Sequence, residues 1–354
     1  MQYLRVHRVT AAAMAIGVTA FSLAACSSSG NGSGGSSKLS GTLNASGSTF
    51  QLTFQQDAIQ SFKSVQSGIT VNYGGGGSGK GRTDLASGTV NFAGSDSPIP
   101  SDETSNFKGK TVLYFPVVIG PITMSYNLTG VTNLKLTPTV IAEIFQAKIT
   151  KWNDPAIASL NPGAKLPSTP ITLAVRSDSS GTTQNFSLFL QDAAPSVWKL
   201  GSSSTISWPS GAHAGDGNGG VAQTIKSTPG AIGYVDYADA KASGLSYASV
   251  QNKTGDYIAP STSAASAAAA GATVAPNLTF AAAWSGGATA YPITYQSWDL
   301  VYAKQSSKTT ADMLKAYLGY LLGAGQKLLP SLNYAPLAAS IDAKAKAQLS
   351  KISS

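Results

Sequence analysis

The chain has 354 residues, of which 42% are hydrophobic and 11% are charged, and its formal net charge is +8. Its lysines and arginines are scattered rather than gathered in a stripe with aromatic residues, so a nucleic-acid-binding protein is not expected. The single cysteine, Cys26, excludes a disulfide within the chain, and the length is sufficient for two ordinary domains.

The N-terminus has the pattern of an export signal. Two arginines precede an uncharged apolar run over residues 11–23, which is too short for a membrane-spanning helix. The motif Leu-Ala-Ala-Cys that ends at Cys26 resembles a bacterial lipobox, in which the cysteine becomes the lipidated first residue of the mature protein. We therefore expect a signal peptide over 1–25 and a tether over 26–38, which consists of an acylated Cys26 (palmitate is expected) and a Ser/Gly stretch. Removal of the two leader arginines takes the charge from +8 to +6, and the protein would be anchored to the cell membrane on its extracytoplasmic face.

Short apolar strands alternate with helical patterns along the remaining chain, which predicts an α/β protein without internal repeats. Phenylalanines at 50, 54 and 62 recur at helical spacing, and Ser48 or Thr49 is expected to cap that helix. The predicted strands cover residues 39–45, 69–73, 90–93, 112–119 (interrupted by Pro116), 171–175, 231–235 and 293–302. The predicted helices cover residues 50–65, 137–145, 181 onward, 262–270 and 309–322.

Four turns rich in Ser, Thr and Gly follow predicted strands, and each is expected to lead into a helix. They are Gly47-Ser48-Thr49-Phe50, Gly77-Ser78-Gly79, Gly94-Ser95-Asp96 and the stretch from Arg176 to Thr182. Helix N-termini offer free backbone N–H groups and a partial positive charge, and hydroxyls add further hydrogen bonds, so such turns favour an anion. Ligands of open α/β sheets collect at the carboxyl ends of strands, so these turns are expected to converge on one site.

Three charged residues in these turns specify the anion further. Arg176 offers a guanidinium fork for an oxyanion, and Asp178 can hold and neutralise that guanidinium. Asp96 suits an anion that carries a proton, because a fully ionised anion would leave two acceptors facing each other. Such a mismatch can give discrimination of about 10⁴–10⁵. The pattern predicts a site for phosphate rather than sulfate, and it leaves arsenate open.

Other functional classes fit the sequence less well. Gly74, Gly79 and Lys80 match a nucleotide-binding P-loop, but Gly81 stands where Ser or Thr would hold Mg²⁺. A hydrolytic triad would depend on His213, and no G-x-S-x-G elbow is present. No metal-ligand spacing is found, so neither a metal nor a cofactor is expected. A surface or adhesion protein would suit the Ser/Gly tether but not the charged residues of the turns.

The chain resembles the phosphate-binding protein (PstS family) of bacterial high-affinity phosphate ABC importers. The matching blocks occur in order along nearly the whole mature chain: GSTF at 47–50, GGSGKG at 76–81, FAGSDSPI at 92–99, KITKWNDPAIASLNPG at 148–163, RSDSSGTT at 176–183, GNGGVAQTI at 217–225 and TPGAIGYVDYADA at 228–240. One departure is Lys80, which stands where many members have a small residue. It is either a solvated lysine on the first helical turn or a source of positive potential near the site.

The resemblance implies a class II periplasmic-binding-protein fold, in which two lobes joined by a two-crossover hinge close on one phosphate. Lobe 1 would comprise residues 39–120 and 293–354, and lobe 2 residues 121–292. The implied partners are the permease and ATPase subunits of an ABC importer, and the protein itself would be a monomeric receptor without catalytic residues. Carried over by motif, the implied phosphate-binding residues are Thr49, Phe50 (through its backbone N–H), Ser78, Asp96 (as acceptor of the phosphate proton), Arg176, Asp178 (as partner of Arg176), Ser180, Gly181 and Thr182.

Overall fold

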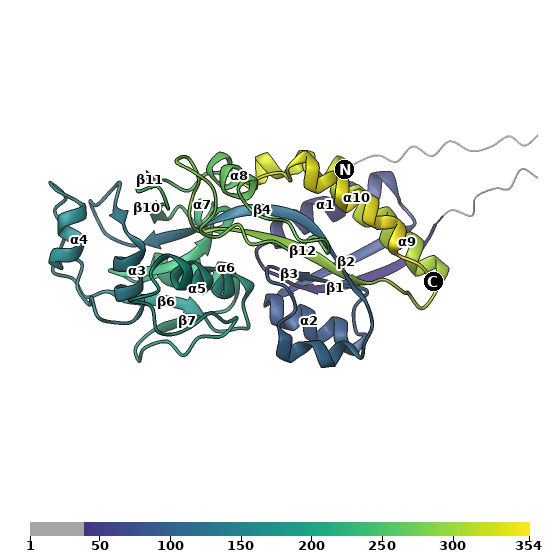
Figure 1. Cartoon of the computed structure of the whole chain (residues 1–354), viewed down its shortest axis with the longest axis horizontal. Helices are drawn as coiled ribbons and strands as arrows, with labels where there is room; N and C mark the ends of the chain where they lie inside the picture. Colours follow the sequence, from purple (N-terminus) through teal and green to yellow (C-terminus); the bar gives the residue numbers. More distant parts are fainter. Residues whose placement is uncertain (1–38) are drawn as a thin grey trace, which may run out of the picture. The chain divides into compact units, whose positions relative to one another are not determined.

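Two long antiparallel strands, β4 (Val112–Tyr126) and β12 (Thr294–Tyr302), form the centre of a mixed sheet. In the computed structural model, which describes residues 39–354, the strand order is β2-β1-β3-β12-β4-β8-β6-β7, and β9 (Ser246–Tyr247) pairs with β4. Figure 1 shows β4 and β12 running between two groups of strands and helices. Both strands are buried almost along their whole length, which is typical of strands that are covered on both faces.

The first group contains three strands in which β1 pairs in parallel with both neighbours. These strands are β1 (Gly41–Gly47), β2 (Ile69–Gly76) and β3 (Phe92–Ser95). Helix α1 (Leu52–Val65) connects β1 to β2, and α2 (Gly77–Ser87) connects β2 to β3. After β12 the chain returns to this group with its C-terminal elements. These are α9 (Lys308–Leu322), α10 (Ala339–Gln348) and the 3-10 helices η2 (Ala324–Leu332) and η3 (Leu349–Lys351).

The second group repeats this plan with β6 at its centre, paired in parallel with β7 and β8. The three strands are β6 (Thr172–Arg176), β7 (His213–Gly215) and β8 (Ala231–Asp236). Each is followed by a helix: α5 (Gly181–Ala193), α6 (Gly217–Ser227) and α7 (Tyr237–Ala242). The remaining elements are η1 (Ser101–Phe107), α3 (Pro138–Phe145), α4 (Pro155–Leu160), α8 (Thr262–Ala270) and a small sheet of β5 (Lys135–Leu136), β10 (Ser249–Gln251) and β11 (Tyr257–Ile258).

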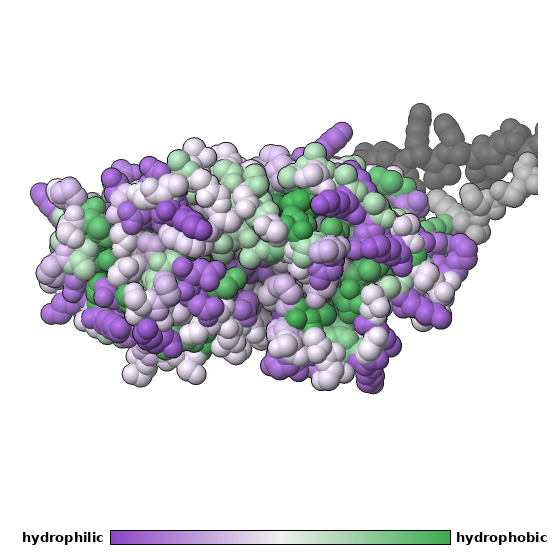
Figure 2. All heavy atoms as spheres, in the orientation of Figure 1, coloured by the Kyte–Doolittle hydropathy of each residue, from purple (hydrophilic) through white to green (hydrophobic). Residues whose placement is uncertain are grey.

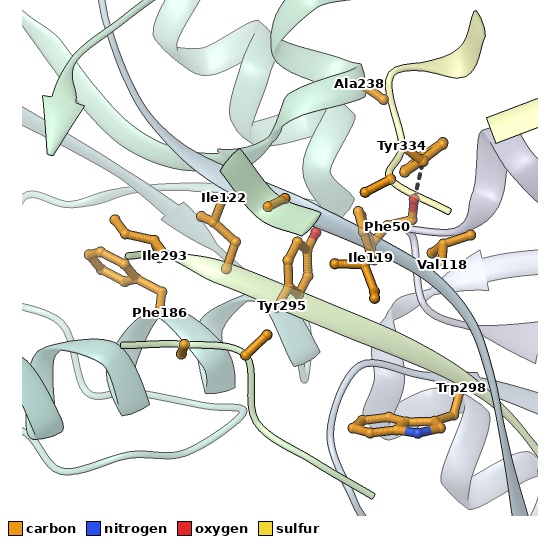
Figure 3. Close-up of a cluster of buried hydrophobic side chains, with 14 of the residues drawn as sticks. Phe50, Val118, Ile119, Ile122, Phe186, Ala238, Ile293, Tyr295, Trp298 and Tyr334 are labelled. Carbon is orange, nitrogen blue, oxygen red and sulfur yellow. Dashed lines mark hydrogen bonds between the residues drawn. The ribbon is translucent and has the colours of Figure 1, made fainter. Parts of the chain in front are cut away.

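The hydrophobic core continues from one group of strands to the other along β4 and β12. Figure 3 shows Ile119 and Ile122 of β4 and Tyr295 of β12 among buried side chains, together with Phe50 of the first group and Phe186 of α5. On the outside, Val65 is the large hydrophobic side chain recorded as exposed among the described residues. Figure 2 shows hydrophilic residues spread over the whole visible face, with hydrophobic areas between them.

Most predicted elements lie within a few residues of their predicted positions, and the exceptions have physical reasons. The predicted strand over 112–119 extends to Tyr126 in spite of Pro116. The register between β4 and β12 shifts beside that proline, because a residue without an N–H is accommodated where the ladder is irregular. The N-cap predicted at Ser48 or Thr49 is wrong, since α1 begins at Leu52 and Gln51 precedes it.

The turn at Asp96 also differs from its prediction, because no α-helix follows β3 directly. The chain bends after Ser95 and enters the 3-10 helix η1 only at Ser101. By contrast, the helix predicted from Gly181 begins there, with Ser180 as its N-cap. The predicted signal peptide over 1–25, Cys26 and the tether up to residue 38 lie outside the described residues. Among residues 39–354, no helix has the length and hydrophobicity that a membrane span requires.

Candidate anion-binding site

Asp96 is a buried carboxylate at the carboxyl end of β3, with only 1% of the residue exposed. Its Oδ1 accepts hydrogen bonds from the hydroxyls of Ser48 at 2.5 Å and Ser297 at 2.6 Å. Its Oδ2 lies 3.3 Å from Ser78 Oγ, which also accepts a hydrogen bond from the Asp96 N–H at 3.0 Å. Burial raises the pKa of Asp96 from 3.8 to about 6, although three serine hydroxyls and the Arg176 guanidinium act in the opposite direction.

Arg176 ends strand β6 and is held by its neighbour in the sequence. Its Nε and Nη2 donate to the two carboxylate oxygens of Asp178, at 2.7 and 2.5 Å, in a bidentate pair. The third nitrogen, Nη1, donates to Thr182 Oγ1 at 3.2 Å. Burial alone would raise the pKa of Asp178, but the Arg176 hydrogen bonds and charge lower it below its ordinary value. The pair therefore stays ionised, with one edge of the guanidinium turned toward α5.

The N-terminus of α5 lies against the turn that carries Asp96. Ser180 Oγ caps the helix by accepting from the Thr183 N–H at 3.1 Å. Gly181 follows, and a Cβ built there would lie 2.6 Å from Asp96 Cβ, so a side chain larger than hydrogen does not fit. Asn185, one turn further along, donates to the backbone carbonyl of Asp96 at 2.7 Å. The two groups of strands therefore contact each other through turns that the sequence analysis predicted to bind an anion.

Thr49 and Phe50 form the third part of this region. Thr49 Oγ1 accepts hydrogen bonds from Asn218 of α6, at 3.3 Å from the backbone N–H and 3.2 Å from the side chain. The Phe50 N–H, which the family resemblance assigns to phosphate, donates to Ser48 Oγ at 3.1 Å. The Phe50 ring stacks on Tyr295 with ring centroids 3.9 Å apart. Tyr334 donates to the Phe50 carbonyl at 2.6 Å, and a dashed line in Figure 3 marks this hydrogen bond.

Four residues of this region were not among the predicted phosphate-binding residues. Ser48 and Ser297 bind Asp96, and Asn218 also donates to Thr182 Oγ1 at 3.3 Å. Within residues 39–354, Asn218 Oδ1 and the Tyr295 hydroxyl are buried and have no hydrogen-bond partner. The GNGG block at 217–220 and the GSTF block at 47–50 pointed to the right segments, but Ser297 and Tyr295 lie in an apolar strand pattern without such a signal. Unpartnered buried polar atoms beside a guanidinium and a helix N-terminus are what a small polar ligand would satisfy.

The P-loop-like sequence takes a different role. Lys80 pairs with Asp84 at 2.5 Å across one helical turn and its side chain is 53% exposed, so it behaves as a solvated surface lysine. A Cβ at Gly81 would lie 2.8 Å from both Gly47 Cα and Ser46 O, so glycine is required for α2 to pack on β1. His213, on which a hydrolytic triad would depend, is exposed in β7. Among the described residues, no group of three or more His, Cys, Asp and Glu is arranged to hold a metal ion.

Comparison with known proteins identifies the class of protein that this fold and site define. The model of the PBP superfamily domain, the domain of periplasmic binding proteins, matches residues 32–324. The subatomic-resolution structure of a periplasmic phosphate-binding protein named PfluDING, bound with phosphate, is 21% identical with a TM-score of 0.72, covering 87% of this chain and 93% of that one. A putative phosphate ABC transporter substrate-binding protein from Clostridium perfringens is 15% identical with a TM-score of 0.62, covering 84% and 100%. The fold is thus the two-lobe α/β fold of periplasmic binding proteins.

The curated relatives narrow the family. Phosphate-binding protein PstS 2 of Mycobacterium tuberculosis is 33% identical over 92% of both chains. Phosphate-binding protein PstS of Pasteurella multocida is 34% identical over 85% of this chain and 92% of its own. The chain belongs to the PstS family within the PBP superfamily.

Proposed function

We propose that this chain is the solute-binding component of a phosphate ABC importer. It would capture inorganic phosphate outside the cytoplasm and deliver it, as a monomer, to the permease and ATPase subunits. Family membership supports a solute-binding protein rather than an enzyme. The observation that carries the choice of phosphate is Asp96, a buried acceptor beside a paired arginine and a helix N-terminus.

Asp96 provides the reason for selectivity. Near neutral pH inorganic phosphate retains a proton and can donate it to a carboxylate, whereas sulfate is fully ionised and cannot. In a buried site, sulfate would leave the carboxylate facing another acceptor without a proton between them. Such an unpaired buried acceptor causes a large loss of binding free energy. With a pKa of about 6, Asp96 is mostly ionised at neutral pH and is therefore able to accept.

The remaining predicted residues would surround the other phosphate oxygens. Arg176 would supply positive charge, with Asp178 fixing its orientation, while Ser180, Gly181 and Thr182 would contribute the helix N-terminus and hydroxyls. Thr49, Phe50 and Ser78 would bind from the opposite side. Because Phe50 N–H and Ser78 Oγ have protein partners here, we expect these bonds to rearrange or be shared when phosphate binds.

The two lobes of this receptor would be residues 39–120 with 293–354, and residues 121–292. The strand order supports this division, because β4 and β12 are the strands that connect the two groups. Capture would proceed by closure of one lobe on the other about this pair of crossovers. Lipidation of Cys26 would hold the receptor at the outer face of the cell membrane, so that released phosphate meets the permease.

Calorimetry of the mature chain, residues 26–354, with phosphate, sulfate and arsenate tests the proposal. We expect binding of phosphate at micromolar concentration and no competition from an equal concentration of sulfate. Equal competition by sulfate, or no heat with phosphate, would refute the assignment. Tighter binding of arsenate than of phosphate would assign the site to arsenate, the other protonated oxyanion. Release of p-nitrophenol from its phosphate ester would instead support an enzyme. Partition of the wild-type chain and Cys26→Ser between membrane and soluble fractions tests the anchor.

A further inference from the structure

The two carboxylate oxygens of Asp96 have different hydrogen-bond partners. Oδ1 accepts two short hydrogen bonds, from the hydroxyls of Ser48 and Ser297, which occupy both of its lone-pair positions. Oδ2 has only the longer contact of 3.3 Å with Ser78. It is also the oxygen that a Cβ at Gly181 would approach, to 2.7 Å, so it faces the N-terminus of α5.

Both serine hydroxyls that contact Oδ1 are obliged to donate rather than accept. Ser48 Oγ accepts from the backbone N–H groups of Phe50 at 3.1 Å and Gln51 at 3.4 Å, so its single proton is directed to Asp96. Ser297 Oγ accepts from the Gln51 side-chain amide at 3.0 Å, and its proton has two acceptors within reach, of which the Asp96 carboxylate at 2.6 Å is closer than the Ser95 carbonyl at 3.4 Å. A hydroxyl has one proton, and these partners determine where it goes.

The orientation of Gln51 is determined in turn by a buried polar chain. Its Nε2 uses both hydrogens, on Ser297 Oγ and on the Trp298 carbonyl at 3.3 Å, while its Oε1 accepts from Gln55 at 2.7 Å. Gln55 has further partners that favour this orientation, because its Nε2 also lies 3.1 and 3.2 Å from the Asp299 carboxyl oxygens and its Oε1 accepts from Tyr317 at 2.6 Å. Gln51, Gln55 and Asp299 are fully buried, so water does not compete for these hydrogen bonds.

We propose that Ser297 and Ser48 are positioning residues for anion selectivity: they saturate Oδ1 of Asp96 and leave Oδ2 as the acceptor for the proton of the bound anion. Gln51, Gln55 and Asp299 hold Ser297 in its donating orientation. The inference rests on the proposed function, since it assigns how the same site separates a protonated from a fully ionised oxyanion. The selectivity for a protonated anion then depends on Ser297 of β12, which acts on the anion only through its hydrogen bond to Asp96.

The ionisation of Asp96 agrees with this assignment. The groups that influence or are influenced by its charge are Arg176 of β6 and the phenols Tyr73 of β2, Tyr295 of β12 and Tyr334 after η2. Burial raises the Asp96 pKa, and among the groups that oppose this rise the Ser297 hydroxyl is the largest. Its removal would therefore raise the pKa further and favour a protonated Asp96, which can donate to sulfate.

The test compares Ser297→Ala with Ser125→Ala in the mature chain at pH 7. Ser125 is a matched control, because it is a fully buried serine whose hydroxyl bonds to one side chain, Thr123, on β4. Phosphate affinity is measured by calorimetry, and sulfate affinity by displacement of labelled phosphate. We expect Ser297→Ala to lose about 10- to 100-fold in phosphate affinity and to narrow the phosphate-to-sulfate ratio by about 10-fold or more. The phosphate affinity and the phosphate-to-sulfate ratio of Ser125→Ala should stay within about twofold of the wild-type values.

A ratio for Ser297→Ala within about twofold of the Ser125→Ala ratio would overturn the inference, because a purely structural defect weakens both anions alike. Ser48→Ala provides a second variant if Ser297→Ala does not fold, and it should narrow the ratio in the same direction. A wild-type chain that binds no phosphate would refute the proposed function itself. Selective wild-type binding with unchanged selectivity in both variants would refute only the role of the two serines.

Discussion

Replacement of Gly181 by alanine places one methyl group at the meeting point of the two groups of strands. A Cβ at this position would lie 2.6 Å from Asp96 Cβ and 2.7 Å from Asp96 Oδ2, and it would also collide with Ser78 Oγ. Asp96 Cβ is attached directly to the backbone, so no rotation of a flexible side chain relieves the contact. Either the turn after β3 or the N-terminus of α5 must move.

The magnitude follows from two contributions. Overpacking of a buried contact costs about 1–3 kcal/mol. Separation of α5 from Asp96 weakens at least one hydrogen bond to a charged group, worth about 1.5–3 kcal/mol. Together these terms predict a loss of about 10²- to 10⁴-fold in phosphate affinity. Without phosphate, opening of the two lobes would relieve the collision, so we expect little change in the melting temperature.

Gly219→Ala is the matched control, because it is a glycine-to-alanine change in α6 whose new Cβ has no atom within 4 Å apart from its chain neighbours and the backbone of its own helix. Its phosphate affinity should equal that of the wild type within about twofold. Isothermal calorimetry in phosphate-depleted buffer measures both variants, and thermal melts confirm that they are folded. Equal phosphate affinities for folded Gly181→Ala and Gly219→Ala would refute the reasoning that these turns close on the anion.

Four further substitutions concern charged groups. Asp96→Asn should weaken phosphate binding by about 10- to 100-fold and strengthen sulfate binding, because Ser48 and Ser297 keep the amide oxygen on their side and so turn its NH₂ toward the anion; unchanged calorimetric selectivity would count against this. Burial raises the pKa of Asp299 from 3.8 to about 8, so the folded chain binds more protons than the unfolded chain between these values. The free energy of unfolding should therefore fall as pH rises from 5 to 8, and calorimetric melts of Asp299→Asn should show a flatter fall, whereas an equal slope would exclude Asp299 as the cause. Arg82→Met should lower the free energy of urea unfolding by about 3 kcal/mol, because it removes a fully buried guanidinium that donates to Glu103 at 2.6 and 2.8 Å. Lys80→Met should change it by less than about 1 kcal/mol and leave phosphate affinity intact, and a large loss of affinity would restore Lys80 to the site.

The sequence by itself determined the class of fold and marked the segments of the candidate site. Alternation of apolar strands with helical patterns predicted elements such as the strand over 231–235 and the helix over 262–270, which the structure contains as β8 and α8. These patterns are local, since they follow from the repeats of single strands and helices. Ser/Gly turns after strands likewise marked the segments that carry Asp96, Arg176 and Gly181, because ligands of α/β proteins bind at the carboxyl ends of strands. Their meeting depends on the tertiary structure, since β3 and β6 run in opposite directions and their carboxyl ends face each other from different groups of strands.

Only the tertiary structure decided which groups complete the site. Ser297 binds Asp96 from 201 positions away in the sequence, and Asn218 reaches Thr49 from 169 positions away, so no local pattern marks either contact. The cap expected at Ser48 failed because α1 starts only at Leu52, so the backbone N–H groups that donate to Ser48 Oγ, those of Phe50 and Gln51, precede the helix. A sequence shows which donors and acceptors exist, but whether a given oxygen is already saturated depends on partners that only the folded chain brings within hydrogen-bonding distance.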